Sequence, residues 1–367
     1  MRSDSGERHE QGKAQTMRRW TQIATIMFAT ALTATSVLAA ERMFVPLGDG
    51  NAVVVIDVAE DKVIGRIDDV SAAHGLAGTP DGRFLIAGSS RTRAPGTAPA
   101  KPTGVAEEDH TAHHAPGTPG AVAEVVSSVT IIRQSDLKIE RRIDVPGAVH
   151  HVAASPDNRI AVVTHPSRNG VSVIDLLAFE ARPLVATGPG ANYAVFSKDG
   201  ALVYVSNGGN GTVSALNTKT WKIVQTFKVG KEPEHLAMAP NGRHLYVNNV
   251  KSGTITEIYL IDPRRTREYR VGTNPHGVDV SDDSDWSYVA VQDENKLVAI
   301  NRKKQPQRTL ALTPEPYHLA VVRGRGKIYV SSAKEPKIWV VDTSTLSVVR
   351  EIPIGGKGHQ MVQEPRT

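Results

Sequence analysis

The sequence has 367 residues, a formal net charge of +5 and no cysteine. The missing thiols exclude disulfides, thiolate metal ligands, iron–sulfur clusters and covalently attached c-type haem. The charge is modest and no long basic run occurs, so we expect no nucleic-acid partner. Paired charges such as Arg264-Arg265 and Lys303-Lys304 are typical of solvated loops.

The N-terminal residues 1–39 have the character of an extension followed by an export signal. Arg18-Arg19 forms a basic end, an apolar run follows at 23–32, and small residues at 37–39 supply cleavage-site chemistry. Translation is expected to start at Met17. The apolar run is short and interrupted by threonines, so we expect no stable membrane span, with an uncleaved anchor as the alternative. These features predict a periplasmic or secreted protein.

Residues 40–367 are built from a repeat. Segments 76–86, 194–205, 233–249 and 319–330 all read as a strand, a tight turn with Gly or Asn, and a second strand. The residues that open these first strands are spaced by 41 or 42 positions, apart from one interval of 76 that contains an insertion. The opening residues are His74, His150, Asn192, Glu234, His276, Tyr317 and His359. A fixed period of this length indicates a repeat architecture.

Each period holds four short strands, which is typical of a propeller blade. In one blade, for example, we expect the third and fourth strands at 258–262 and 267–271, and in another we expect them at 171–175 and 182–186. The N-terminal set 43–68 lacks a first strand, and the strand after His359 lacks the other three. Joining these pieces would leave no exposed sheet edge. We therefore predict a monomeric, all-β, seven-bladed propeller with four-stranded blades, closed by the C-terminal first strand.

The second strands carry a recognisable motif. It occurs as Tyr204-Val205-Ser206-Asn207, Tyr246-Val247-Asn248-Asn249 and Tyr329-Val330-Ser331-Ser332. These residues resemble the YVTN-type β-propeller repeats, and the resemblance covers essentially all of 43–365. It implies the fold without choosing a function. Similar propellers serve as surface-layer proteins, as periplasmic binding proteins, and as domains of haem d1 nitrite reductases and nitrous oxide reductase.

Two adjacent positions open each first strand, and six of the seven blades place a histidine at one of them. First strands are innermost in a propeller and begin at one mouth of its central channel. We call the mouth of the channel, with the residues that open the first strands, the hub. Its candidate metal ligands are His74, His150, His151, His235, His276, His318 and His359, together with Glu234. Imidazole suits zinc, copper and haem iron. The alternative is a repeated structural histidine that packs between blades.

The insertion at 91–121 is rich in Ala, Pro, Gly and Thr, and we expect it to be mobile. It contains His110, His113 and His114, which are further candidate ligands. It joins the second and third strands of its blade, so it should emerge on the face of the hub mouth. His165 should share that face and is a further candidate ligand. The alternative is a solvated linker with incidental histidines.

Signatures of catalysis are missing: there is no Gly-rich phosphate loop before a helix, no nucleophile elbow and no HExxH. The favoured prediction is non-enzymatic binding of zinc or copper at the hub. Periplasmic metal handling follows from it, with a metal-transport or redox protein as partner. One alternative is a redox or tetrapyrrole-binding protein, by resemblance to haem d1 propellers. The other is a protein-binding scaffold whose histidines are structural.

Overall fold

The structure is a computed structural model that describes residues 41–97, 125–303 and 306–365. The chain divides into two compact units, Met1–Ala39 and Ala40–Thr367, and every described residue belongs to the second. The predicted export signal therefore lies outside the described residues. Among the described residues, no helix is both long enough and apolar enough to cross a membrane.

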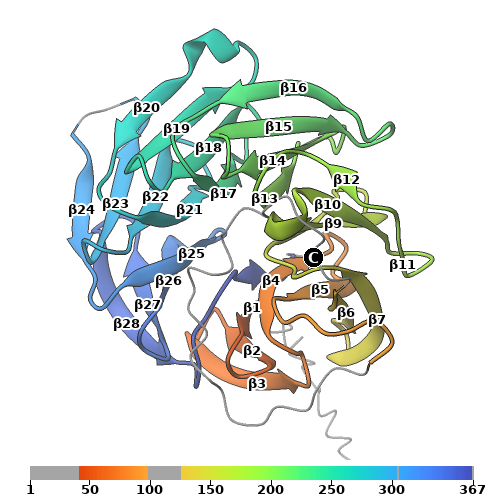
Figure 1. Ribbon diagram of the computed structural model, residues 1–367. Coiled ribbons are helices and arrows are strands. Elements are labelled where there is room, and N and C mark those ends of the chain that lie inside the picture. The colour runs from red at the N-terminus through yellow and green to blue at the C-terminus, as the bar shows by residue number, and fades with distance from the viewer. Residues whose placement is uncertain (1–40, 98–124, 304–305, 366–367) are drawn as a thin grey trace, which may run out of the picture. The chain divides into compact units, whose positions relative to one another are not determined.

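The second unit is the predicted all-β propeller of seven antiparallel sheets (Figure 1). Blades 1 to 3 contain β1 (Arg42–Leu47), β2 (Ala52–Asp57), β3 (Lys62–Asp68), β29 (Val362–Gln363); β4 (Ala73–Gly78), β5 (Phe84–Ser89), β6 (Val126–Arg133), β7 (Lys138–Pro146); and β8 (Val152–Ala154), β9 (Ile160–His165), β10 (Gly170–Asp175), β11 (Glu180–Ala181), β12 (Val185–Ala186). Blades 4 and 5 contain β13 (Ala191–Phe196), β14 (Leu202–Asn207), β15 (Thr212–Asn217), β16 (Ile223–Lys228); and β17 (Pro233–Met238), β18 (His244–Asn249), β19 (Thr254–Tyr259), β20 (Arg267–Arg270). Blades 6 and 7 contain β21 (Pro275–Val280), β22 (Trp286–Val291), β23 (Lys296–Asn301), β24 (Arg308–Ala311); and β25 (Pro316–Val322), β26 (Lys327–Ser332), β27 (Lys337–Asp342), β28 (Ser347–Pro353).

The ring closes through the pairing of the two ends of the chain, as the repeat pattern predicted. β29 pairs with β1, with Val362 opposite Phe44, so it supplies the inner strand that blade 1 lacks. Outside the ladder, Arg42 Nε donates to Glu364 Oε2 at 2.8 Å. The closure removes the exposed edge of β1, which would otherwise offer unpaired backbone groups to another chain.

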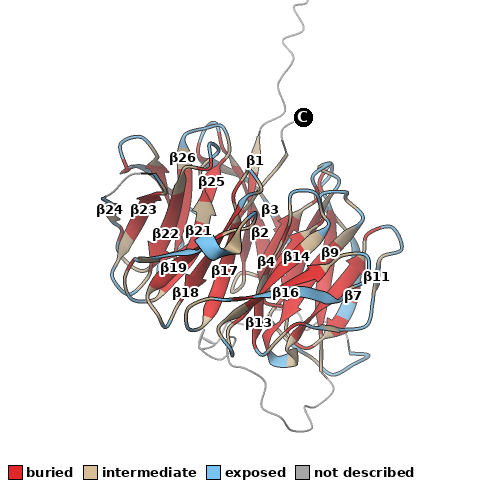
Figure 2. Cartoon of the chain, turned by 90° about the horizontal axis from the view of Figure 1, so that it is seen from above, coloured by how far each residue is buried: buried red, intermediate tan, exposed pale blue. Residues whose placement is uncertain are grey.

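The hydrophobic core lies between blades. Each pair of neighbouring blades, including the pair formed by blades 7 and 1, encloses one cluster of buried apolar side chains among the described residues. The three inner strands are buried, whereas outer strands such as β16 and β28 are largely exposed (Figure 2). The first strands of consecutive blades contact one another around the axis. This packing places the start of every first strand at the hub.

The turn after each first strand is fixed by local chemistry. In blade 5 the Asn241 side chain accepts from the backbone N–H of Arg243, and Asp157 and Asp199 do the same in blades 3 and 4. Gly242, which lies between Asn241 and Arg243, has a φ of 68°, a left-handed conformation that glycine adopts at little cost. The repeated Asp-Gly and Asn-Gly pairs of the sequence therefore mark real turns.

Two strand positions differ from the sequence prediction. The third strand of blade 5 is Thr254–Tyr259 rather than 258–262, because the chain turns at Leu260 and enters a short 3-10 helix, Pro263–Arg265. The fourth strand of blade 3, expected at 182–186, is split into β11 and β12. Pro183 lies in the gap, where its missing N–H cannot join the ladder.

Candidate metal centre at the hub

β-Bulges turn the two adjacent residues that open a first strand out of the regular sheet. In blade 5, Pro233 pairs with Asn249 and Leu236 pairs with Val247, so Glu234 and His235 lie in a register shift between them. Shifts at the same place occur in blades 2, 4, 6 and 7. A bulge frees its residues from strict alternation between the two sheet faces. These side chains can therefore point to the axis and not into the cores between the blades.

The first positions form a buried layer of the hub. Every one of these seven side chains belongs to a residue that is buried: His74, His150, Asn192, Glu234, His276, Tyr317 and His359. The ring centroid of His74 lies 4.6 Å from that of His150 and 4.4 Å from that of His359. His276 stacks on Tyr317 with centroids 4.0 Å apart. The layer is thus a packed ring of four imidazoles, one phenol, one amide and one carboxyl group.

The second positions face a central channel of about 440 Å³. His151, His235 and His318 line it, together with Gln360 and Asp279. Blades 2 and 6 have glycine here. A Cβ on Gly75 would lie 2.8 Å from the Cα atom of His151 and from the backbone nitrogen of Val152, because the backbone of blade 3 packs there. The glycines are therefore required by close packing between blades.

In the part of the chain that the structure describes, two groups of three histidines could hold a metal ion. His74, His318 and His359 form one group, and His235, His276 and His318 form the other; in each group one ligand atom per residue lies within 4.8 Å of the others. His318 belongs to both groups. Its ring lies 4.9 Å from His235 and 5.0 Å from His276, centroid to centroid. His318 is therefore the residue at which the two groups meet.

Hydrogen bonds set the tautomers of several hub histidines. His74 Nδ1 lies 2.9 Å from the backbone oxygen of His150, and His150 Nδ1 lies 3.0 Å from that of Asn192. A carbonyl oxygen only accepts, so Nδ1 carries the hydrogen and Nε2 keeps the lone pair that a metal needs. His151 has the opposite tautomer, because its Nδ1 accepts from the backbone N–H of Ala194 at 3.3 Å. His151 Nε2 is then a donor and is poorly suited to ligation.

Burial keeps His318 and His151 neutral. It lowers the pKa of His318 well below the ordinary value, and nearby histidines beginning with His235 lower it further. Burial likewise lowers the pKa of His151. The opposite shift applies to Glu234, whose pKa is raised to about 8 by burial and then by Glu232. Neutral imidazole is the protonation state that ligates a metal ion.

His165 lies outside both three-histidine groups. It occupies the last position of the four-residue motif, where blades 4 and 5 have Asn207 and Asn249. Its Nδ1 donates to Ala148 O at 3.0 Å and its Nε2 contacts Ser172 Oγ at 2.9 Å. Asn207 makes the matching contact to Ser214 Oγ at 2.9 Å. His165 therefore makes the contact to a serine hydroxyl that the motif asparagine makes in other blades. Burial lowers the pKa of His165 to about 4.

The third motif position links neighbouring blades at the hub, which the sequence analysis missed. Thr164 Oγ1 donates to Asn192 O at 2.6 Å, and Ser206 Oγ donates to Glu234 O at 2.5 Å. Asn248 bonds the backbone oxygen of His276 in the same way. Each acceptor is the first hub position of the next blade. The signal was available, because a polar residue recurs at this place in the motif.

The described ends of the insertion emerge beside the hub. Ser89 at the end of β5 pairs with Ala73 at the start of β4, and Arg93 forms a bridge with Val126 beyond it. His110, His113 and His114 lie outside the described residues.

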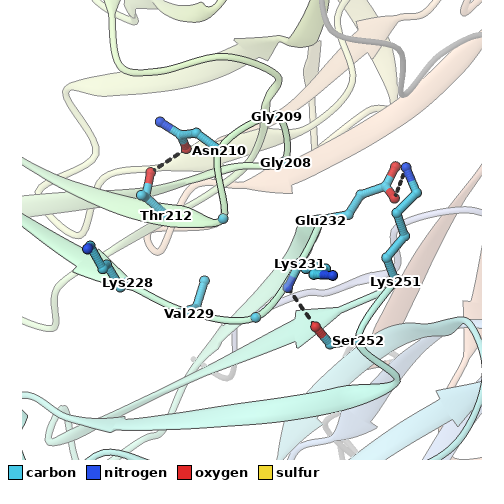
Figure 3. Close-up of a pocket in the computed structure, with 12 residues that line it drawn as sticks. Gly208, Gly209, Asn210, Thr212, Lys228, Val229, Lys231, Glu232, Lys251 and Ser252 are labelled. Carbon is cyan, nitrogen blue, oxygen red and sulfur yellow. Dashed lines mark hydrogen bonds and ion pairs between the residues drawn. The ribbon is translucent and has the colours of Figure 1, made fainter.

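A second hollow, of about 720 Å³, lies at the same end of blades 4 and 5 (Figure 3). Its Lys251 pairs with Glu232 at 2.9 Å (Figure 3).

A seven-bladed propeller with a buried histidine hub is the class that the fold and the site define, and the expected resemblance to propeller repeats is confirmed. The family described as YNCE-like beta-propeller matches residues 176–313 of this chain. No curated protein gives a significant match.

Solved structures of other propellers superpose on most of the chain. Hydrazine synthase of Kuenenia stuttgartiensis has a TM-score of 0.63 at 15% identity, over 83% of this chain and 92% of that chain. The periplasmic gluconolactonase PpgL of Pseudomonas aeruginosa has a TM-score of 0.67 at 16% identity, over 88% and 99%. A functionally unknown protein of Desulfotomaculum acetoxidans reaches 0.67 at 14%, over 89% and 99%. At these identities the similarity shows the fold alone.

Proposed function

We propose that this protein binds a transition metal ion, zinc or copper, at the hub and that it serves in metal handling rather than in catalysis. The observation that carries the proposal is the meeting of two three-histidine groups at His318. Three imidazoles with a fourth position left for another ligand suit zinc, and imidazole also suits copper.

The chemistry of the surroundings supports this assignment. The imidazoles are buried, and the backbone carbonyl beside His74 orients its Nε2 lone pair. A divalent cation in a buried site needs a compensating negative charge. Glu234 can supply that charge, because its Oε2 lies 3.5 Å from Nδ1 of His276. A bound cation would favour the ionised carboxylate, so binding should release a proton.

We place the protein outside the cytoplasm, with the insertion as the arm that captures metal. The export signal at 1–39 supports the location, and the composition of 91–121 with His110, His113 and His114 supports the arm. The described ends of this segment lie at the hub side of blade 2. A periplasmic transport or redox protein is the proposed partner.

The alternatives have less support from the geometry. A tetrapyrrole would need a planar slot beside an axial histidine, whereas the rings of His74, His318 and His359 pack within 6.0 Å of one another, centroid to centroid. A protein-binding scaffold with structural histidines accounts for the repeat. It gives no reason for two groups of buried imidazoles to meet at His318.

The test is elemental analysis of the mature protein, purified from its export compartment without an affinity tag or chelator. We expect near-stoichiometric zinc or copper, and in His318→Gln we expect affinity to fall by about hundredfold or more. His165→Asn is the matched control, because it changes a buried histidine outside both groups. Deleting 98–121 tests the arm. Metal lost only in that deletion would place the site in the arm, and no metal uptake by any form would leave the scaffold alternative.

A further inference from the structure

A second candidate site lies at the end of blade 5 opposite the hub. It is a pocket of about 190 Å³ between blades 5 and 6, and its charged lining is dominated by arginines. The lining residues are Asn241, Arg243, His244, Glu257, Tyr259, Arg265, Arg267 and Arg302. Seven come from blade 5, and Arg302 follows the third strand of blade 6. The sequence analysis had placed Arg265 among ordinary solvated charges.

The cationic lining is not balanced by carboxylates. Glu257 is the acidic residue of the pocket wall, and it is buried. Its oxygens are engaged by the hydroxyl of Tyr269 at 2.7 Å and by Nδ1 of His244 at 2.9 Å. Outside the wall, Asp285 pairs with Arg302 at 2.9 Å, but the same carboxylate also holds Lys303 at 2.6 Å.

In the described part of the chain the other three arginines form no ion pair with a carboxylate, although Glu257 lies opposite Arg267 in the β-ladder and Asp262 lies near Arg265. Arg267 Nη1 donates to the backbone oxygen of Arg302 at 3.2 Å, and the Arg265 guanidinium lies 5.0 Å from the ring centroid of Tyr259. Within the described residues, the Arg243 side chain makes no hydrogen bond or ion pair. Gathering four like charges around one pocket costs free energy unless an anion joins them.

We infer that this pocket binds a compact oxyanion, namely a phosphate or carboxylate group carried by a small molecule. Guanidinium groups present paired N–H donors that match the oxygens of these groups. The volume of the pocket suits a compact oxyanion. A water molecule takes about 30 Å³ in the liquid, and the pocket holds about six such volumes. The site is separate from the metal centre, because the turn at Asn241–Arg243 lies at the far end of the ladder from Glu234.

The test is isothermal titration of the full mature chain with inorganic phosphate and with malonate, each compared with sodium chloride at equal ionic strength. We expect binding that chloride does not reproduce. The better of the two ligands identifies the group that the pocket prefers. Arg243→Gln and Arg267→Gln should each weaken it about ten- to hundredfold, since each removes a charge-assisted contact.

Arg159→Gln is the matched control. Arg159 occupies in the blade 3 turn the place that Arg243 occupies in blade 5, and it should leave binding unchanged. Arg243 is exposed, so its replacement should not disturb folding, which circular dichroism would check. A response equal to that of chloride would overturn the inference. So would titrations in which Arg243→Gln and Arg267→Gln bind as tightly as the parent, or in which Arg159→Gln loses as much. His318→Gln should bind phosphate normally, which keeps this test independent of the metal centre.

Discussion

The Nδ1 atom of His74 lies 2.9 Å from the backbone oxygen of His150, the residue that opens the first strand of the next blade. The same relationship joins His150 to Asn192. The backbone of each following blade thus fixes the ring nitrogen that the preceding histidine can offer to a metal. Which ring nitrogen is available as a metal ligand therefore depends on how closely neighbouring blades pack at the axis.

The two histidine groups should be separable by mutation. His74→Gln removes a ligand from one group, and His276→Gln removes a ligand from the other. We expect each variant to keep metal in the untouched group, and we expect the double variant to resemble His318→Gln. Metal-to-protein ratios by plasma mass spectrometry would check this. Complete loss in either single variant would show instead that the two groups act as one site.

Removing the hydroxyl of Thr164 should loosen the hub. Its Oγ1 accepts from the backbone N–H of His151 at 2.9 Å and donates to Asn192 O at 2.6 Å. Thr164→Val leaves the buried N–H of His151 unsatisfied and removes one of the two hydrogen bonds to Asn192 O, so the free energy of unfolding should fall by about 1–3 kcal/mol. Urea denaturation is the measurement. Thr164→Ser keeps the hydroxyl and should cost less; equal losses in the two variants would assign the effect to packing.

The glycine that follows His74 should tolerate no side chain. A Cβ on Gly75 would come within 2.8–2.9 Å of backbone atoms of His150, His151 and Val152. We expect Gly75→Ala to lower the free energy of unfolding by about 1–3 kcal/mol or more, because backbone cannot move aside as a flexible side chain can. Gly65→Ala is the control, since its Cβ would meet Val55 at an ordinary 3.6 Å. Equal denaturation midpoints for the two variants would contradict this account.

His165 should make the propeller sensitive to acid. Its folded-state pKa is about 4 because of burial, against about 6.5 when unfolded. Between these values the unfolded state binds more protons, so the stabilisation is complete above pH 6.5 and is lost as the pH falls towards 4. The loss should reach about 3 kcal/mol for this group. Burial lowers the pKa of His151 and of His318 as well, so these groups act with the same sign.

The matching variant is His165→Asn, which keeps the position of the Nδ1 donor to Ala148 O. Its unfolding free energy should decline less steeply between pH 6.5 and 4 than that of the parent. Denaturation series across this range would measure both slopes. Parallel slopes would mean that His165 is not buried in its neutral form.

Much of the candidate site could be read from the sequence, because the repeat fixes the register. Histidines at one position of the period must lie at one place in every blade, so His74, His276 and His359 were predicted to gather at the hub. The sequence could not reveal the bulge that turns Glu234 and His235 towards the axis, since a bulge depends on how two strands pair. It placed His165 on the face of the hub mouth but could not reveal that His165 makes the hydrogen bond of the motif asparagine, since that depends on contacts to Ala148 and Ser172.

The sequence by itself determined the number of blades, the four strands of each and the closure of the ring by the chain end. These follow from strand alternation, turn residues and period, which are local chemistry repeated along the chain. The tertiary structure alone decided that two histidine groups share His318, which tautomers they adopt, and that Arg302 joins the arginines of blade 5. Such relationships arise where different blades touch, and their geometry is set by packing between segments that no local pattern connects.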